Sequence, residues 1–145
     1  GVTILEAGQR HRIGFISFYV EGIHHNLIVR LLNDRYGIQT RGGCSCAGTY
    51  GHILLNIDYE ESHKITELID LGDMSKKPGW VRISLHPTMT DSEVNYIAAA
   101  VEEVIKNHSE WGKDYRFDKH SGDFEFLKGE PFTIDIKKSL RLGEN

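Results

Sequence analysis

The spacing of apolar and polar positions divides the chain into predicted strands and helices. Residues 12–20 are apolar or aromatic on both faces, which predicts a buried strand. Residues 80–85 alternate, so a second strand is predicted there, with an apolar face opposite the face that carries Arg82. A third, shorter strand is predicted at 38–41, where it leads into a glycine-rich loop.

Three segments have the apolar spacing of amphipathic helices. The first covers residues 24–36. The second follows the capping pattern Asp58-Tyr-Glu-Glu61, and the third and strongest begins at the capping box Thr90-Asp-Ser-Glu93. Residues 49–57 fit a helix or a strand equally well.

The last part of the chain has a different pattern. Two short aromatic segments, 115–117 and 124–126, flank a turn and predict a hairpin. The order of elements predicts an α/β fold of the two-layer α+β type, with helices covering one face of a small mixed sheet of three to four strands. We expect a single domain over residues 1–145, in which residues 111–145 form a peripheral hairpin and tail.

The net charge and the length of the apolar runs indicate which classes of binding partner to expect. The formal net charge of −4 gives no general attraction to nucleic acid, so nucleic acid is not expected as a partner. No apolar run reaches the roughly 20 residues of a membrane helix, so no membrane partner is expected either. The chain begins at Gly1 instead of methionine, and we expect it to be processed or cut from a longer protein.

Cysteine and histidine usage favours no metal site. The two cysteines, Cys44 and Cys46, are too close for an ordinary structural disulfide, so we expect a reducing, cytoplasmic setting. Together they supply two of the four ligands that a structural zinc site needs. The adjacent His24 and His25 are interpreted as helix-cap or surface residues.

Two features are candidates for chemistry. The loop Arg41-Gly-Gly-Cys-Ser-Cys-Ala47 places cysteines on a flexible backbone near an arginine, which favours a reactive thiolate, and the alternatives are a metal-binding pair or an inert buried thiol. Arg82 lies within a predicted strand, where a guanidinium can hold a carboxylate through two hydrogen bonds. The alternative is an edge arginine that faces water or an acidic neighbour.

These motifs together resemble a known family. The loop at 41–47, followed by Arg82-Ile-Ser84 and then Thr90-x-x-Glu93, is similar to the C-terminal part of the class V aminotransferase-fold enzymes that use pyridoxal phosphate. The nearest branch is that of the cysteine desulfurases and selenocysteine lyases, which have an Arg-x-Gly-x-x-Cys-Ala loop, an Arg-x-Ser strand and a Thr-x-x-Glu helix start in this order. The resemblance spans residues 12 to about 106.

The resemblance implies roles for three residues. Cys46 falls on the catalytic cysteine, whose thiolate takes the substrate sulfur. Arg82 falls on the arginine that holds the α-carboxylate of the substrate, and Arg41 falls on the loop arginine beside the active site. The family often has two histidines where this chain has Cys44 and Ser45, which leaves open whether Cys46 or Cys44 is reactive.

The resemblance also implies a cofactor and partners. Pyridoxal 5'-phosphate would be bound by an N-terminal domain that supplies the Schiff-base lysine, so the present chain alone is expected to be inactive. Lys64 follows a histidine as that lysine often does, but its place on a predicted helix after the cysteine loop makes it a surface lysine. We expect an amino-acid substrate and a homodimer of the full-length protein. Two alternatives remain: another class V aminotransferase or lyase without desulfurase activity, and a stand-alone thiol redox or metal-binding module.

Overall fold

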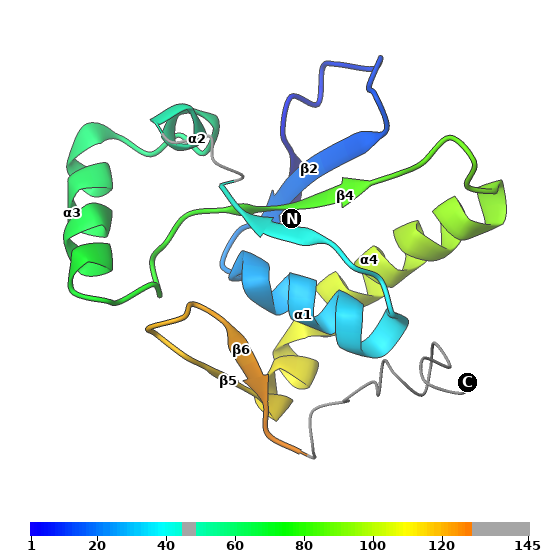
Figure 1. The fold of residues 1–145 in the computed structure, drawn as a ribbon. Helices are drawn as coiled ribbons and strands as arrows, with labels where there is room; N and C mark the ends of the chain where they lie inside the picture. Colours follow the sequence, from blue (N-terminus) through cyan, green and yellow to red (C-terminus); the bar gives the residue numbers. More distant parts are fainter. Residues whose placement is uncertain (45–48, 129–145) are drawn as a thin grey trace, which may run out of the picture.

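The computed structural model describes residues 1–44 and 49–128, and its main layer is a four-stranded sheet (Figure 1). The strand order in this sheet is β1-β2-β4-β3. The strands are Val2–Ile4 (β1), Phe15–Val20 (β2), Arg41–Gly43 (β3) and Trp80–Ser84 (β4). A separate two-stranded hairpin consists of Tyr115–Phe117 (β5) and Phe124–Phe126 (β6).

The strand pairings explain the fold class. The predicted α+β arrangement of helices on a small sheet is confirmed. The three pairings in the main sheet are antiparallel, whereas a mixed sheet was expected. The reason is the position of β4. It pairs antiparallel with both β2 and β3, so these two parallel strands are separated by β4 and do not pair with each other.

The helices differ in how they contact the sheet. They are His25–Tyr36 (α1), Thr49–Leu54 (α2), Tyr59–Asp70 (α3) and Asp91–Trp111 (α4), and α4 continues into a 3₁₀ turn at Gly112–Asp114. Helices α1 and α4 lie together on one face of the sheet, while α2 and α3 stand at one end of it (Figure 1). The ambiguous segment at 49–57 therefore begins with a short helix.

The hydrophobic core lies between the sheet and the pair α1 and α4. Its fully buried side chains are Ile28, Leu31, Leu32, Val81 and Val104. Full burial of an aliphatic side chain of this size contributes roughly 1.5–3 kcal/mol. The alternation predicted for 80–85 is confirmed, because Val81 and Ile83 of β4 belong to this core while Arg82 does not.

The helix starts follow their predicted capping patterns. The Asp58 carboxylate accepts a hydrogen bond from the Glu61 backbone at 2.8 Å, and Thr90 and Glu93 form a reciprocal capping box at the start of α4. At the start of α1, His24 Nδ1 accepts from the Asn26 backbone at 3.2 Å. His24 is therefore a cap, as expected. His25 is not a surface residue, because its side chain is buried.

The strand predicted at 12–20 begins later, at Phe15. Residues before it form a loop that returns to β1, a strand that the apolar pattern did not predict. Gly14 has a φ of +76°, and a Cβ atom there would lie 2.6 Å from the carbonyl oxygen of Leu85. The chain therefore turns at a glycine before it enters the sheet.

The β5–β6 hairpin packs against the start and the outer side of α1. The Asn26 amide donates to the Gly122 carbonyl at 2.7 Å, and the Tyr115 hydroxyl donates to Asp34 at 3.0 Å. Tyr115 is 8% exposed and belongs to the main core cluster. The hairpin thus shares the core of the sheet layer.

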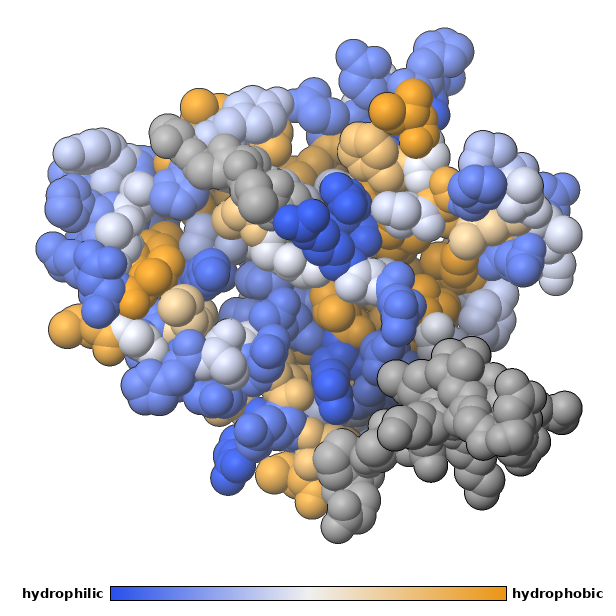
Figure 2. All heavy atoms as spheres, in the orientation of Figure 1, coloured by the Kyte–Doolittle hydropathy of each residue, from blue (hydrophilic) through white to orange (hydrophobic). Residues whose placement is uncertain are grey.

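The surface shows several separate apolar patches. In Figure 2, hydrophobic side chains on the face in view are interspersed with hydrophilic ones. Among the described residues, no helix combines the length and the apolar character that crossing a membrane requires.

Candidate functional site

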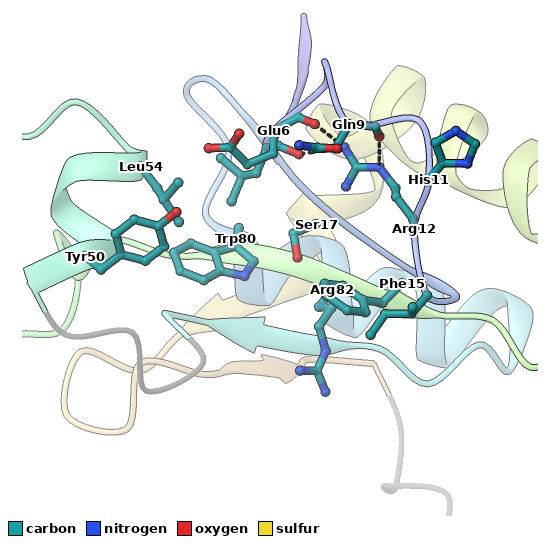
Figure 3. A pocket seen from close by; sticks show the side chains of 12 residues that line it. Glu6, Gln9, His11, Arg12, Phe15, Ser17, Tyr50, Leu54, Trp80 and Arg82 are labelled. Atoms are coloured by element: carbon teal, nitrogen blue, oxygen red, sulfur yellow. Dashed lines mark hydrogen bonds between the residues drawn. The ribbon is translucent and has the colours of Figure 1, made fainter.

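A cleft of about 470 Å³ lies on the face of the sheet opposite α1 and α4 (Figure 3). The N-terminal loop, β2, β4 and α2 contribute to its walls. The apolar side chains among its described lining residues are Leu5, Ile13, Phe15, Tyr50, Leu54 and Trp80. Two arginines, Arg12 and Arg82, are also among the described residues that line the cleft.

Arg82 lies at the centre of the sheet beneath this cleft. On β4 it stands directly opposite Ser17 of β2 on one side and Arg41 of β3 on the other. Side chains of directly paired residues share a face of the sheet, so Arg41 and Arg82 are neighbours, although only Arg82 is among the described residues that line the cleft. The structure thus brings together two of the three residues that the sequence proposed for the site.

The Arg82 side chain is partly buried. Its Nε is fully buried and has no hydrogen-bond partner among the described residues. In Figure 3 the guanidinium extends from β4 across β3, away from Arg12. An unsatisfied buried donor costs free energy of about 1–3 kcal/mol, so this nitrogen favours a bound acceptor such as a carboxylate.

Trp80 fixes the neighbouring part of the wall. Two residues before Arg82 on the same strand, it lies on the same face and is 5% exposed. The side chains of Tyr50 and Leu54, from α2, lie beside its indole ring (Figure 3). This contact attaches α2, the helix that follows the cysteine loop, to the sheet.

Arg12 holds the N-terminal wall of the cleft. Its guanidinium donates to the carbonyl oxygens of Leu5 at 3.0 Å and Gln9 at 2.9 Å, and also to Glu6 (Figure 3). Sequence reasoning did not identify Arg12. The binding partners are backbone carbonyls of a loop, and no residue pattern marks such contacts in advance.

Cys44 has the environment of an inert thiol. Its Sγ donates to the Pro78 carbonyl at 2.9 Å, and the residue is half-buried. Burial raises the pKa of the Cys44 thiol, and the nearby Lys77 opposes this rise only in part. A raised pKa reduces the thiolate fraction at neutral pH. Cys46, the residue predicted to be catalytic, lies outside the described residues.

Two glycines, Gly42 and Gly79, enclose the His25 ring at the base of the cysteine loop. A Cβ atom on Gly79 would lie 2.6 Å from His25 Cε1 and 2.8 Å from the Cα of Gly43, and one on Gly42 would lie 3.1 Å from His25 Cδ2. Burial, together with the charges of His24 and Lys77, lowers the pKa of His25 to about 4. His25 is therefore neutral at pH 7, and the sequence alone gave no indication that it is enclosed.

The described residues of the cleft do not include the lysine that the expected cofactor requires. Pyridoxal phosphate needs a lysine for its covalent attachment. None of the described residues that line the cleft is a lysine, and Lys64 lies exposed on α3. The described residues therefore suit the carboxylate of a substrate and not the attachment of the cofactor.

A metal centre has no set of ligands in the described part of the chain. Among residues 1–44 and 49–128, no group of three or more His, Cys, Asp or Glu side chains is placed to hold a metal ion.

Comparison with known proteins identifies the family. No curated protein matches the chain significantly. The aminotransferase class-V family matches residues 1–97, which contain both arginines, both cysteines and the start of α4. The matched segment covers more than half of the 145 residues, and the β5–β6 hairpin lies beyond it. The chain therefore belongs to the class V aminotransferase family, whose enzymes depend on pyridoxal phosphate.

Proposed function

We propose that this chain is the C-terminal domain of a cysteine desulfurase-like or selenocysteine lyase-like enzyme, and that it presents Arg82 to the α-carboxylate of an amino-acid substrate. The cofactor is then bound by a separate N-terminal domain that completes the cleft. We propose further that the full-length protein is a cytoplasmic homodimer.

The environment of Arg82 is the observation that carries this proposal. Its Nε is buried without a partner among the described residues, and its side chain lies on the cleft face. A carboxylate that accepts two hydrogen bonds from the guanidinium would satisfy this nitrogen. Such binding orients the substrate and so lowers the entropic part of the reaction barrier.

Arg41 supports the same binding site from the neighbouring strand. Arg41 stands directly opposite Arg82 across the β3–β4 ladder, so it adds a second positive charge near the guanidinium of Arg82. The negative charge of a substrate carboxylate would be attracted by both groups.

Cys46 is the proposed sulfur acceptor. The resemblance of the loop at 41–47 to the desulfurase loop supports this role. The environment of Cys44 supports it indirectly, because that thiol is half-buried and donates to a backbone carbonyl. Of the two cysteines, Cys44 is thus the less suited to act as a nucleophile.

The test uses the protein that carries this chain together with its cofactor-binding domain. Sulfide release from L-cysteine, with an added thiol reductant that reduces the enzyme-bound persulfide to sulfide, is measured for Cys46→Ser and for Cys44→Ser as the matched control. We expect Cys46→Ser to abolish sulfur release and Cys44→Ser to retain most of it. If Cys46→Ser releases sulfur normally, Cys46 is not the sulfur acceptor and the proposal is wrong. If the parent protein releases no sulfur from L-cysteine, the chain belongs to a class V aminotransferase or lyase without desulfurase chemistry.

A second measurement tests the role of Arg82. We expect Arg82→Lys to raise the KM for the amino acid about tenfold or more, because a lysine cannot form the two parallel hydrogen bonds. An unchanged KM would contradict the assignment of Arg82.

A reversible disulfide couple between the two cysteines, or a metal bound at unit stoichiometry, would favour a stand-alone thiol redox or metal-binding module.

A further inference from the structure

We propose that a second cavity, at the N-terminus of α1, binds a small tetrahedral oxyanion such as phosphate. This cavity has a volume of about 110 Å³ and is separate from the Arg82 cleft, with which it shares no lining residue. The side chains that matter for binding are those of His24, His25 and Lys77, whereas the Ser121 hydroxyl, which also lines the cavity, already donates to Asp118 at 3.0 Å. The proposal is independent of the substrate and of the reaction proposed above.

His24 presents a donor to this cavity. Its Nδ1 accepts the Asn26 backbone N–H at 3.2 Å, so in the neutral ring Nε2 carries the proton. Nε2 is buried and has no hydrogen-bond partner among the described residues. Burial lowers the pKa of His24, and the nearby Met74 carbonyl opposes this lowering in part. That carbonyl nevertheless does not form a hydrogen bond with Nε2. A bound acceptor would satisfy this nitrogen.

His25 provides a second imidazole at the cavity. Its side chain is 7% exposed, and its ring stacks on that of His24, with centroids 4.4 Å apart and planes 23° from parallel. Two stacked imidazoles therefore line the same small space, and His24 Nε2 has no hydrogen-bond partner among the described residues.

The charges around the cavity favour an anion. Lys77 lines the cavity, and α1 is a helix of 12 residues whose positive end begins there. Two nearby acceptors are already bonded, because the Asn26 amide donates to the Gly122 carbonyl at 2.7 Å and to the Asp123 carboxylate at 3.2 Å. The Asp123 charge acts on His24, but Asp123 is not among the described residues that line the cavity, whereas Lys77 is.

The size of the cavity fits one small oxyanion. A volume of about 110 Å³ corresponds to between three and four waters at ~30 Å³ each. Water could satisfy the His24 N–H group, but it would neither neutralise Lys77 nor interact as favourably with the positive end of α1. A tetrahedral anion does all three. Its binding should also raise the pKa of both histidines, because a nearby negative charge favours their protonated form.

The residues that line the cavity come partly from the segment that matches the family and partly from the hairpin beyond it. His25 and Lys77 lie within the segment that matches the class V family, whereas Ser121 and Gly122 belong to the hairpin beyond residue 97. The oxyanion site therefore depends on the hairpin that the family match does not cover.

The experiment follows the histidine ring signals of the full chain by NMR while inorganic phosphate is added at constant ionic strength, with chloride as the balancing salt. We expect saturable shifts of the His24 and His25 signals and a higher pKa for both. Lys77→Gln should weaken phosphate binding about tenfold. Lys76→Gln removes an adjacent exposed lysine that does not line the cavity, and it should leave binding unchanged.

Three results would overturn the proposal. The first is the absence of saturable shifts at His24 and His25. The second is an equal loss of binding in the Lys76 and Lys77 variants, which would indicate a general charge effect. The third is tighter binding of acetate than of phosphate, because a planar carboxylate would then be the ligand. Circular dichroism of both variants verifies that the fold is retained.

Discussion

Arg41 and Arg82 stand directly opposite each other where β3 pairs with β4. The Nε of Arg82 is buried without a hydrogen-bond partner among the described residues, and Arg82 lines the cleft. A carboxylate bound there satisfies this nitrogen, so its binding should stabilise the folded chain as well as orient a substrate.

The first prediction concerns this stabilisation. Addition of a small apolar carboxylate to the chain should raise its melting temperature, because the ligand binds the folded state only. Arg82→Gln should abolish the rise. Arg10→Gln, which changes an exposed arginine outside the cleft lining, serves as the control and should preserve it. The measurement is thermal unfolding with and without the ligand, and an equal rise in the Arg82 variant would contradict the prediction.

The second prediction concerns the two thiols. In Cys46→Ser the remaining thiol is Cys44, whose pKa is raised by burial and whose Sγ donates to Pro78. It should react slowly with iodoacetamide at pH 7.5, and the rate should rise only at clearly alkaline pH, since the thiolate is the reactive form. Cys44→Ser, which retains Cys46, should react faster. Rate against pH for each variant checks this, and equal profiles would contradict it.

The third prediction concerns acid stability. The pKa of His25 is lowered from 6.5 to about 4 in the folded chain. The stability that depends on neutral His25 is therefore fully present above pH 6.5 and is lost as the pH falls towards 4, because the unfolded chain takes up the proton first. The expected loss by pH 4 is roughly 3 kcal/mol.

A pair of variants isolates this effect. His25→Asn should be less stable than the parent at pH 7 but should lose less further stability between pH 6.5 and 4. His63→Gln, in the exposed part of α3, should keep the acid sensitivity of the parent. Urea unfolding at several pH values provides the comparison. Identical pH dependence in the parent and in His25→Asn would show that another group is responsible.

The fourth prediction concerns the start of α4. Thr90→Ala removes the side-chain half of the capping box and should destabilise the chain by about 1 kcal/mol. Ser92→Ala lies two residues later in the first turn, where no cap contact involves the side chain, and should have little effect. Chemical denaturation measures both. A similar loss in the two variants would mean that helix propensity, and not the cap, dominates.

The fold could be predicted from the sequence where local patterns and tertiary packing agree. The alternation at 80–85, the Asp58 cap of α3 and the capping box at 90–93 have local causes, and they are present as expected. The sheet pairing could not be predicted this way. Whether β2 and β3 pair with each other depends on the insertion of β4 between them, which is decided by residues far apart in the sequence.

The candidate site shows the same limit. The motif around Arg82 indicated a binding arginine, and its strand position could be predicted from alternation. The enclosure of His25 could not, because it results from Gly42 and Gly79 approaching it from two different segments. The contacts of Arg12 with backbone carbonyls could not be predicted either, because every residue has a carbonyl group and no side-chain pattern marks the ones that accept.

The two edges of the main sheet are its shortest strands. Both β1 and β3 have three residues, whereas the central strands β2 and β4 have six and five. A short edge offers few free backbone groups to a strand from another molecule. The charge of Arg41 further discourages two copies from meeting along β3. The order of strand lengths across the sheet thus protects the chain from edge-to-edge aggregation.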